Sequence, residues 1–136
     1  MEKIEGLEES FVNAKTIMMT TFGRDGERHD RPMMNLNRSP YEPMDFTTYK
    51  ETRKVEDILG NPEIIIGFPG RTEDEYFEIT GRAGFEPDDY VQERWEFWYS
   101  ELHPWAKAFF WFPRFLHHGN WAIIRVYPEL ARRLSR

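Results

Sequence analysis

The stretch Phe46-Thr47-Thr48-Tyr49-Lys50-Glu51-Thr52-Arg53-Lys54 joins the end of an apolar strand to the start of a helix. Its last three residues place a hydroxyl group and two cations where the helical pattern begins. Cationic side chains, a hydroxyl donor and the free N–H groups of a helix N-terminus all stabilise bound negative charge. The stretch therefore predicts a strand that leads into a phosphate-binding helix start.

A β-hairpin is expected upstream of this stretch. Thr16 to Phe22 is rich in Thr, Ile and Met and predicts a strand, and Gly23-Arg24-Asp25-Gly26 supplies a tight turn. An Asp-Gly pair suits the positive φ angle that such turns require. The returning strand is expected from about Arg28 to Leu36, and Pro32 places it at a sheet edge or beside a ligand.

Four further segments complete a pattern of six short strands. They are Met44 to Thr48, Glu63 to Phe68, Tyr76 to Phe85 and Trp121 to Val126. In the third of them the small residues Gly81 and Ala83 indicate close backbone packing or a bend. Short strands that are joined mostly by hairpins, with few helices between them, favour a small antiparallel barrel.

Four helices are expected around these strands. Their ranges are 2–13, 52–59, 87–102 and 128–134. The second is expected to bury Val55, Ile58 and Leu59, and Gly60-Asn61-Pro62 ends it. No form is assigned to the aromatic-rich segment 103–119.

Composition narrows the class of protein. A chain of 136 residues is expected to fold as a single domain, 1–136. The net charge of -6 argues against nucleic acid or an anionic membrane as the main partner. Without cysteine the chain forms no disulfide and no thiolate metal site, so a cytoplasmic location is the default. The mean hydropathy of -0.72, with no long apolar run, excludes a membrane span.

The histidines give little reason to expect a metal site. His117 and His118 are adjacent, which is weak evidence for a pair of ligands. His29 and His103 have no obvious carboxylates at ligand spacing. Polar loop histidines are therefore favoured over metal ligands.

Taken in order, these motifs resemble the pyridoxamine 5′-phosphate oxidase-like family of FMN-binding split barrels, in its short general-stress-protein form. The resemblance runs from about Ala14 to Val126. It is carried by the hairpin with Arg31-Pro32-Met33, by Phe46-Thr47-Thr48 with Thr52-Arg53-Lys54-Val55, by Gly60-Asn61-Pro62 and by Ile79-Thr80-Gly81. It implies a fold that is mainly β with some α, a six-stranded antiparallel split β-barrel with flanking helices.

The resemblance also implies an FMN site. In such a site the following residues would contact the cofactor: Arg31, Pro32, Met33, Met34, Thr47, Thr48, Thr52, Arg53, Lys54 and Tyr76. Thr52, Arg53 and Lys54 stand where the family has a Ser-Arg-Lys grip on the phosphate. Tyr76 stands where the oxidases use Gln, which is a departure from their pattern.

The substrate and the assembly follow from the same resemblance. True pyridoxamine phosphate oxidases carry an Arg-x-His pair near the C-terminus, and residues 121–128 have no such His. We therefore expect an FMN-dependent oxidoreductase that is not a pyridoxamine phosphate oxidase, with no catalytic side chain assigned. The family's pocket lies between two subunits, so a homodimer is implied.

Two alternatives remain open at this point. The first is a flavin-binding stress or sensor protein without turnover. The second keeps the fold but changes the ligand to deazaflavin or haem, both of which occur among relatives. A spectrum separates the ligands, whereas kinetics separate an enzyme from a binding protein.

Overall fold

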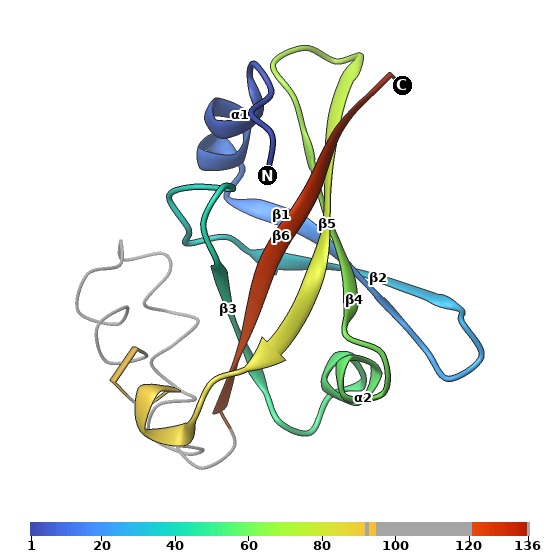
Figure 1. Ribbon diagram of the computed structural model, residues 1–136, viewed down its shortest axis with the longest axis vertical. Helices are drawn as coiled ribbons and strands as arrows, with labels where there is room; N and C mark the ends of the chain where they lie inside the picture. Colours follow the sequence, from blue (N-terminus) through green and yellow to red (C-terminus); the bar gives the residue numbers. More distant parts are fainter. Residues whose placement is uncertain (92, 95–120, 136) are drawn as a thin grey trace.

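The computed structural model describes residues 1–91, 93, 94 and 121–135. Six strands form one sheet in the order β2-β1-β4-β5-β6-β3, and neighbouring strands are antiparallel. Figure 1 shows the sheet curled into a half-barrel, with α2 at one end and α1 near the N-terminus. Because β2 and β3 end the strand order as separate edges, the barrel stays open. The predicted fold class is confirmed.

Five of the six strands coincide closely with the predicted segments, and the sixth extends well beyond its predicted end at Val126. Their bounds are β1 (Thr16–Phe22), β2 (Arg28–Met34), β3 (Met44–Tyr49), β4 (Glu63–Pro69), β5 (Glu75–Phe85) and β6 (Trp121–Ser135). The hairpin turn forms as expected, because Gly26 has a φ of 83° and the Gly23 N–H donates to the Glu27 carbonyl at 2.9 Å. Pro32 lies in β2, an edge strand, where a residue without an N–H group can be accommodated because no hydrogen bond of the sheet is lost.

Helix α1 (Leu7–Asn13) is shorter than the predicted range 2–13, whereas α2 (Arg53–Gly60) matches the predicted 52–59 to within one residue. Residues 88–91 begin a third helix. In α2 the expectation that Leu59 is buried is wrong: its side chain is 73% exposed, because the inward arc is centred near Ile58. No helix among the described residues has the length and apolar character needed to cross a bilayer.

The predicted helix over 128–134 is wrong, because β6 runs without interruption from Trp121 to Ser135. Leu130 and Leu134 lie four residues apart, a spacing that shares one face in a strand as well as in a helix. They pair with Thr80 and Tyr76 of β5, which are also paired with β4, so β6 covers the second edge of β5. At this end of the chain, cations of β6 pair with carboxylates of β5: Arg132 with Glu78 and Arg133 with Glu75, each at 3.1 Å.

A register shift between Thr80 and Gly81 lets β5 and β6 stay paired past Pro128. A Cβ atom at Gly81 would lie 2.3 Å from the Tyr127 carbonyl oxygen, so only glycine fits this approach. The expectation of close backbone packing at Gly81 is confirmed.

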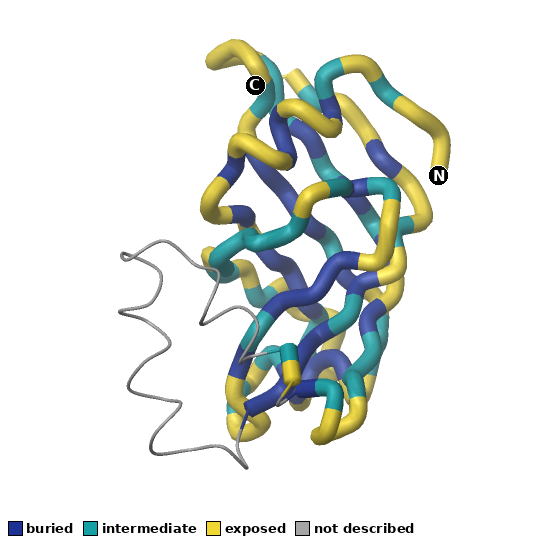
Figure 2. Tube along the Cα trace, turned by 90° about the vertical axis from the view of Figure 1, so that its left-hand side faces the viewer, coloured by how far each residue is buried: buried dark blue, intermediate teal, exposed yellow. Residues whose placement is uncertain are grey.

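Two apolar clusters occupy opposite faces of the sheet. The larger lies inside the half-barrel and includes Phe46, Ile66 and Phe77. The smaller joins Trp121 and Ile123 to residues of the segment that follows β5. Figure 2 shows the buried stretches along the middle of the strands, with exposed residues concentrated at turns and chain ends.

Candidate functional site

The start of α2 carries the predicted phosphate-binding residues. Thr52 is the N-cap residue, in extended conformation, and Arg53 and Lys54 open the helix. The Thr52 hydroxyl donates to the Tyr49 carbonyl at 3.1 Å instead of accepting from the first turn of α2. The first-turn N–H groups therefore have no side-chain cap, which leaves them for an anion.

Arg31 of β2 approaches this helix from the inner face of the sheet. It lies opposite Met19 of β1, whose side chain is fully buried in the core. Its Nη1 donates to the Thr21 hydroxyl at 2.7 Å, and its Nη2 lies 3.8 Å from Asp57 Oδ2. These contacts hold the guanidinium group, whose side chain is 20% exposed, beside α2.

The three cations influence one another electrostatically. Burial lowers the pKa of Arg31; Asp57 and Asp30 oppose this shift, and Arg53 adds to it. Burial also lowers the pKa of Lys54, and the charge of Arg31 lowers it further. Neither Arg53 nor Lys54 has a salt bridge within the described part of the chain. We refer to Arg31, Arg53 and Lys54 as the cationic cluster; a bound anion would relieve its repulsion.

Asp57 connects this cluster to His29. Its Oδ2 accepts from the Thr21 hydroxyl at 2.7 Å and lies 2.6 Å from His29 Nδ1. Burial alone would raise the pKa of Asp57, but the hydrogen bonds from His29 and Thr21 and the nearby positive charges lower it overall. Asp57 therefore stays ionised and fixes the side chains around it.

The sequence did not predict this role for His29 or Asp57. His29 lies in β2 rather than in a loop, and it has carboxylates on two sides, Asp57 and Glu27. Its alternation with Arg31 on the strand was the available signal, because residues two apart share a face. The signal for Asp57 was its position in α2: it is a charged residue that lies between the apolar positions Val55 and Ile58 and is buried with them.

The other predicted residues of β2 face in different directions. Met33 packs against the large inner cluster, whereas Met34 packs against the smaller cluster on the opposite face. Pro32 is exposed and pairs with Met18. The backbone of this segment continues directly from Arg31, so a ligand held there could extend along it.

Thr47 and Thr48 also lie on opposite faces, because side chains alternate along β3. Thr48 is 6% exposed, and its hydroxyl is buried without a hydrogen-bond partner. Thr47 lies opposite Ile123 of the smaller cluster. A ligand on one face of the sheet could therefore contact either Thr47 or Thr48, but not both. To reach the Thr48 hydroxyl, it would have to displace the groups that bury it.

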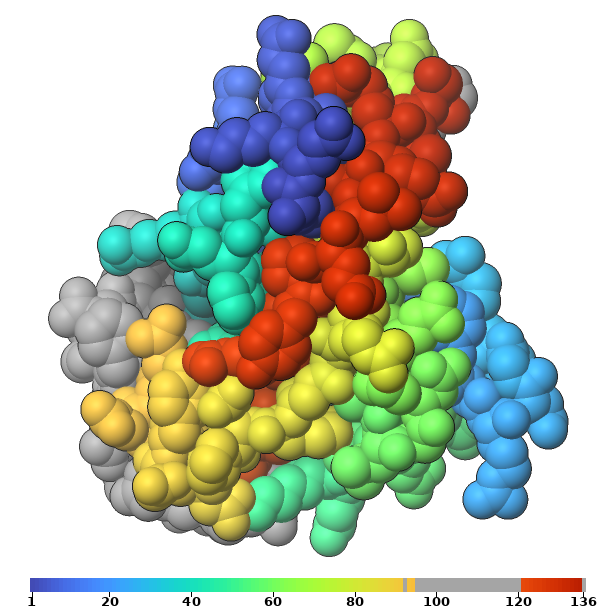
Figure 3. All heavy atoms as spheres, in the orientation of Figure 1, coloured from blue at the N-terminus to red at the C-terminus, as the bar shows by residue number. Residues whose placement is uncertain are grey.

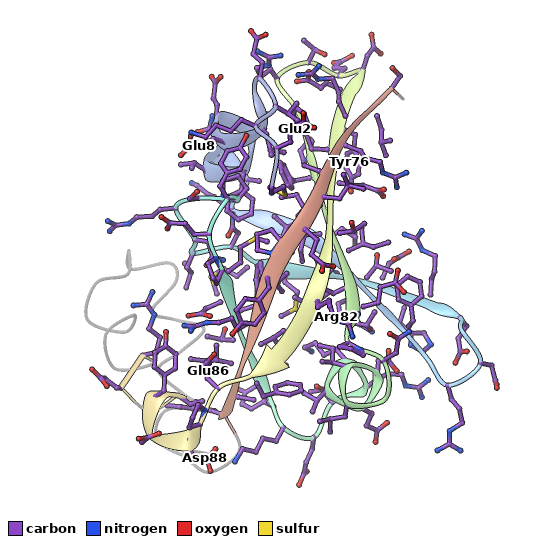
Figure 4. The ribbon with its side chains drawn as sticks, in the orientation of Figure 1. Glu2, Glu8, Tyr76, Arg82, Glu86 and Asp88 are labelled. Carbon is purple, nitrogen blue, oxygen red and sulfur yellow. The ribbon has the colours of Figure 1, made fainter. Side chains whose placement is uncertain are left out.

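Tyr76 is not brought to the cationic cluster within one chain. Figure 4 shows it towards one end of β5, whereas Arg82 lies nearer α2. At about 3.3 Å per residue, the six positions between them correspond to about 20 Å. The Tyr76 hydroxyl instead covers Gly67, where a Cβ atom would approach it to 2.4 Å.

Some predictions lie outside the described residues. These are His103, His117, His118, the aromatic-rich segment 103–119 and the later part of the helix over 87–102. Within the described ranges, no group of three or more His, Asp or Glu side chains could hold a metal ion.

Comparison with known families gives one extensive match. The family described as "Pyridoxamine 5'-phosphate oxidase like" matches residues 2–132. None of the curated proteins matches the sequence.

Solved structures share the fold at low identity. A Clostridium acetobutylicum protein related to general stress protein 26 has a TM-score of 0.72 at 17% identity, covering 94% of this chain and 84% of its own. An FMN-binding, pyridoxamine 5′-phosphate oxidase-related protein of Nostoc punctiforme has a TM-score of 0.67 at 16% identity, covering 99% and 87%. A protein named F420 reductase has a TM-score of 0.71 at 18% identity, covering 96% and 98%. At these identities the similarity establishes the fold alone.

Proposed function

Since this chain belongs to the pyridoxamine 5′-phosphate oxidase-like family, we propose that it is an FMN-binding flavoprotein and an oxidoreductase. The observation that carries the proposal is the cationic cluster at the uncapped start of α2. Three cations from two separate elements converge there, and Lys54 is half-buried without a salt bridge in the described structure. A phosphate monoester fits this donor set.

Each residue of the cluster has a distinct part in holding the phosphate. Arg31 is oriented in advance by Thr21 and Asp57, so it loses little conformational freedom on binding. Arg53 and Lys54 add charge at the positive end of the helix dipole. Charge-assisted hydrogen bonds contribute about 1.5–3 kcal/mol each, so a few of them with ring burial reach the ~8 kcal/mol of micromolar affinity.

Bound FMN would supply hydride or electron transfer at its ring. The segment Pro32–Met34 would lie along the ribityl chain and ring, with Thr47 or Thr48 approaching from β3. We also propose a homodimer with the cofactor between subunits, in which Tyr76 would serve the partner's site. Pyridoxamine phosphate is not proposed as the substrate, because residues 121–128 lack the Arg-x-His pair. The arginine in this segment, Arg125, instead donates hydrogen bonds to Asp45 at 2.8 and 3.0 Å.

The proposal is tested by the double variant Arg53→Ala, Lys54→Ala. It should lose FMN while the apoprotein remains folded, because both side chains lie at the surface or half-buried. The matched control is Arg132→Ala with Arg133→Ala, which removes the same charge from exposed positions of β6. Unchanged flavin content in the first double variant would refute the assignment.

Spectra and thermal melts of the wild-type protein separate the alternatives. Flavin bands with one FMN per chain support the proposal, and FMN at a hundredfold excess over Kd should add about 2.7 kcal/mol of stability. Haem or deazaflavin would give different absorption bands. Turnover of bound flavin with a nicotinamide donor distinguishes an enzyme from a non-catalytic binding protein.

A further inference from the structure

A cleft of about 970 Å³ lies between the β1–β2 hairpin and α2. Figure 3 shows the hairpin standing out from the body of the molecule beside α2. The cleft is lined by Phe22, Gly23, Arg24, Gly26, Glu27, His29, Arg53, Glu56, Asp57, Leu59, Gly60 and Asn61. Only Arg53 is shared with the cationic cluster.

The order of residues along β2 places this cleft beyond the phosphate. Arg31 stands between Pro32–Met34 on one side and His29 with Glu27 on the other. A flavin that lies along Pro32–Met34 with its phosphate at Arg31 would therefore end where the cleft begins. From Arg31 to Glu27 the strand extends by about 13 Å, which is enough for a nucleoside.

The lining suits a neutral group that bears hydroxyls. Phe22 and the exposed Leu59 offer apolar surface to a flat ring. The side chain of Glu56 has no hydrogen bond or ion pair within the described residues, and a free carboxylate is a good acceptor for ribose hydroxyls. Carboxylates outnumber guanidinium groups in the lining, so a polyanionic tail is disfavoured.

We propose that the cleft binds the adenosine part of a flavin dinucleotide, so that the site prefers FAD to FMN. This inference rests on the proposed function, since it requires the flavin phosphate at the cationic cluster. Arg53 lies in both the cluster and the cleft and would contact the second phosphate. Asn61, at the end of α2, supplies a further polar group to the adenine end.

The test measures the Kd of FMN and of FAD for the apoprotein by flavin fluorescence. Wild-type protein should bind FAD at least about tenfold more tightly than FMN, a difference of about 1.4 kcal/mol. Gly60→Phe should abolish that preference and leave FMN affinity unchanged, because a Cβ atom at Gly60 would meet nothing within 4 Å and the added ring would occupy the cleft that Gly60 lines. Gly84→Phe, in β5 and outside the cleft, is the matched control.

A second variant tests the same site without added bulk. Leu59→Glu introduces a negative charge at an exposed lining position and should weaken FAD more than FMN. FMN binding without a preference for FAD would overturn this inference and leave the proposed function standing. A preference for FAD that survives both variants would also overturn it, whereas failure of both flavins to bind would refute the proposed function itself.

Discussion

At the scale of single residues, Asp57 has the widest influence on the candidate site. It accepts from Thr21, lies 2.6 Å from His29 and pairs with Arg31. Its side chain is only 7% exposed, so these partners replace water around the charge. Removing the charge would leave Arg31 without the group that orients it.

Asp57→Asn is predicted to destabilise the protein by about 1–3 kcal/mol at neutral pH. The folded pKa of Asp57 is lowered from its ordinary value of 3.8, because the bonds from His29 and Thr21 and nearby positive charges outweigh burial. The wild-type advantage is therefore present above that value and is lost as the pH falls through the lowered folded pKa. Urea unfolding from neutral to strongly acidic pH measures it.

Asp30→Asn is the matched control, because Asp30 lies in β2 next to Arg31 but has a side chain that is 48% exposed. It should change stability by no more than about 0.5 kcal/mol at neutral pH. An equal loss in both variants would show that the environment of Asp57 is not what stabilises the fold.

At the scale of elements, the local sequence pattern predicted β1 to β5 correctly but predicted a helix where the second half of β6 lies. The hairpin of β1 and β2 was predictable because its turn chemistry and alternation are contained in neighbouring residues. The identity of β6 was not, since it depends on the length of β5, which is remote in sequence. The spacing of Leu130 and Leu134 fits both a helix and a strand, so only the pairing with β5 decides which of the two forms.

The strand character of residues 128–134 predicts a large effect at one position and almost none at its neighbour. Ala131 is 9% exposed and faces the core, whereas Leu130 is 53% exposed. Ala131→Asp should cost about 2–4 kcal/mol by burying an unpaired charge, and Leu130→Asp should stay within about 0.5 kcal/mol. Chemical denaturation compares them; similar losses would contradict the alternation of β6.

The hairpin turn gives a second prediction at this scale. Gly26 has a φ of 83°, so Gly26→Ala should cost about 1 kcal/mol although nothing surrounds the site. Gly60→Ala, at a site equally open but without a positive φ, should be neutral or slightly stabilising. Thermal melts test the pair, and the reverse order would contradict the backbone explanation.

At the scale of the whole molecule, the fold and the cationic cluster could be predicted because each cation belongs to a local motif. The network behind it could not, since Thr21, His29 and Asp57 come from three elements that meet only in the folded barrel. Tyr76 lies far along β5 from α2, so a role at the flavin depends on a second chain.

That dependence predicts the assembly. Sedimentation should show a species of twice the chain mass of 16.4 kDa, and dilution to monomer should release flavin. Tyr76→Ala should weaken flavin binding without changing the mass. A monomer that retains its full flavin content would contradict the shared site.

The position of β6 between β5 and β3 also bears on how the protein is synthesised. β3 finds no partner in the sheet until the segment from Trp121 onward has left the ribosome, although β1, β2, β4 and β5 can already pair. A nascent chain stalled before that point would display an unpaired edge with buried-type residues such as Phe46. Such stalled chains are expected to recruit chaperones that full-length protein does not.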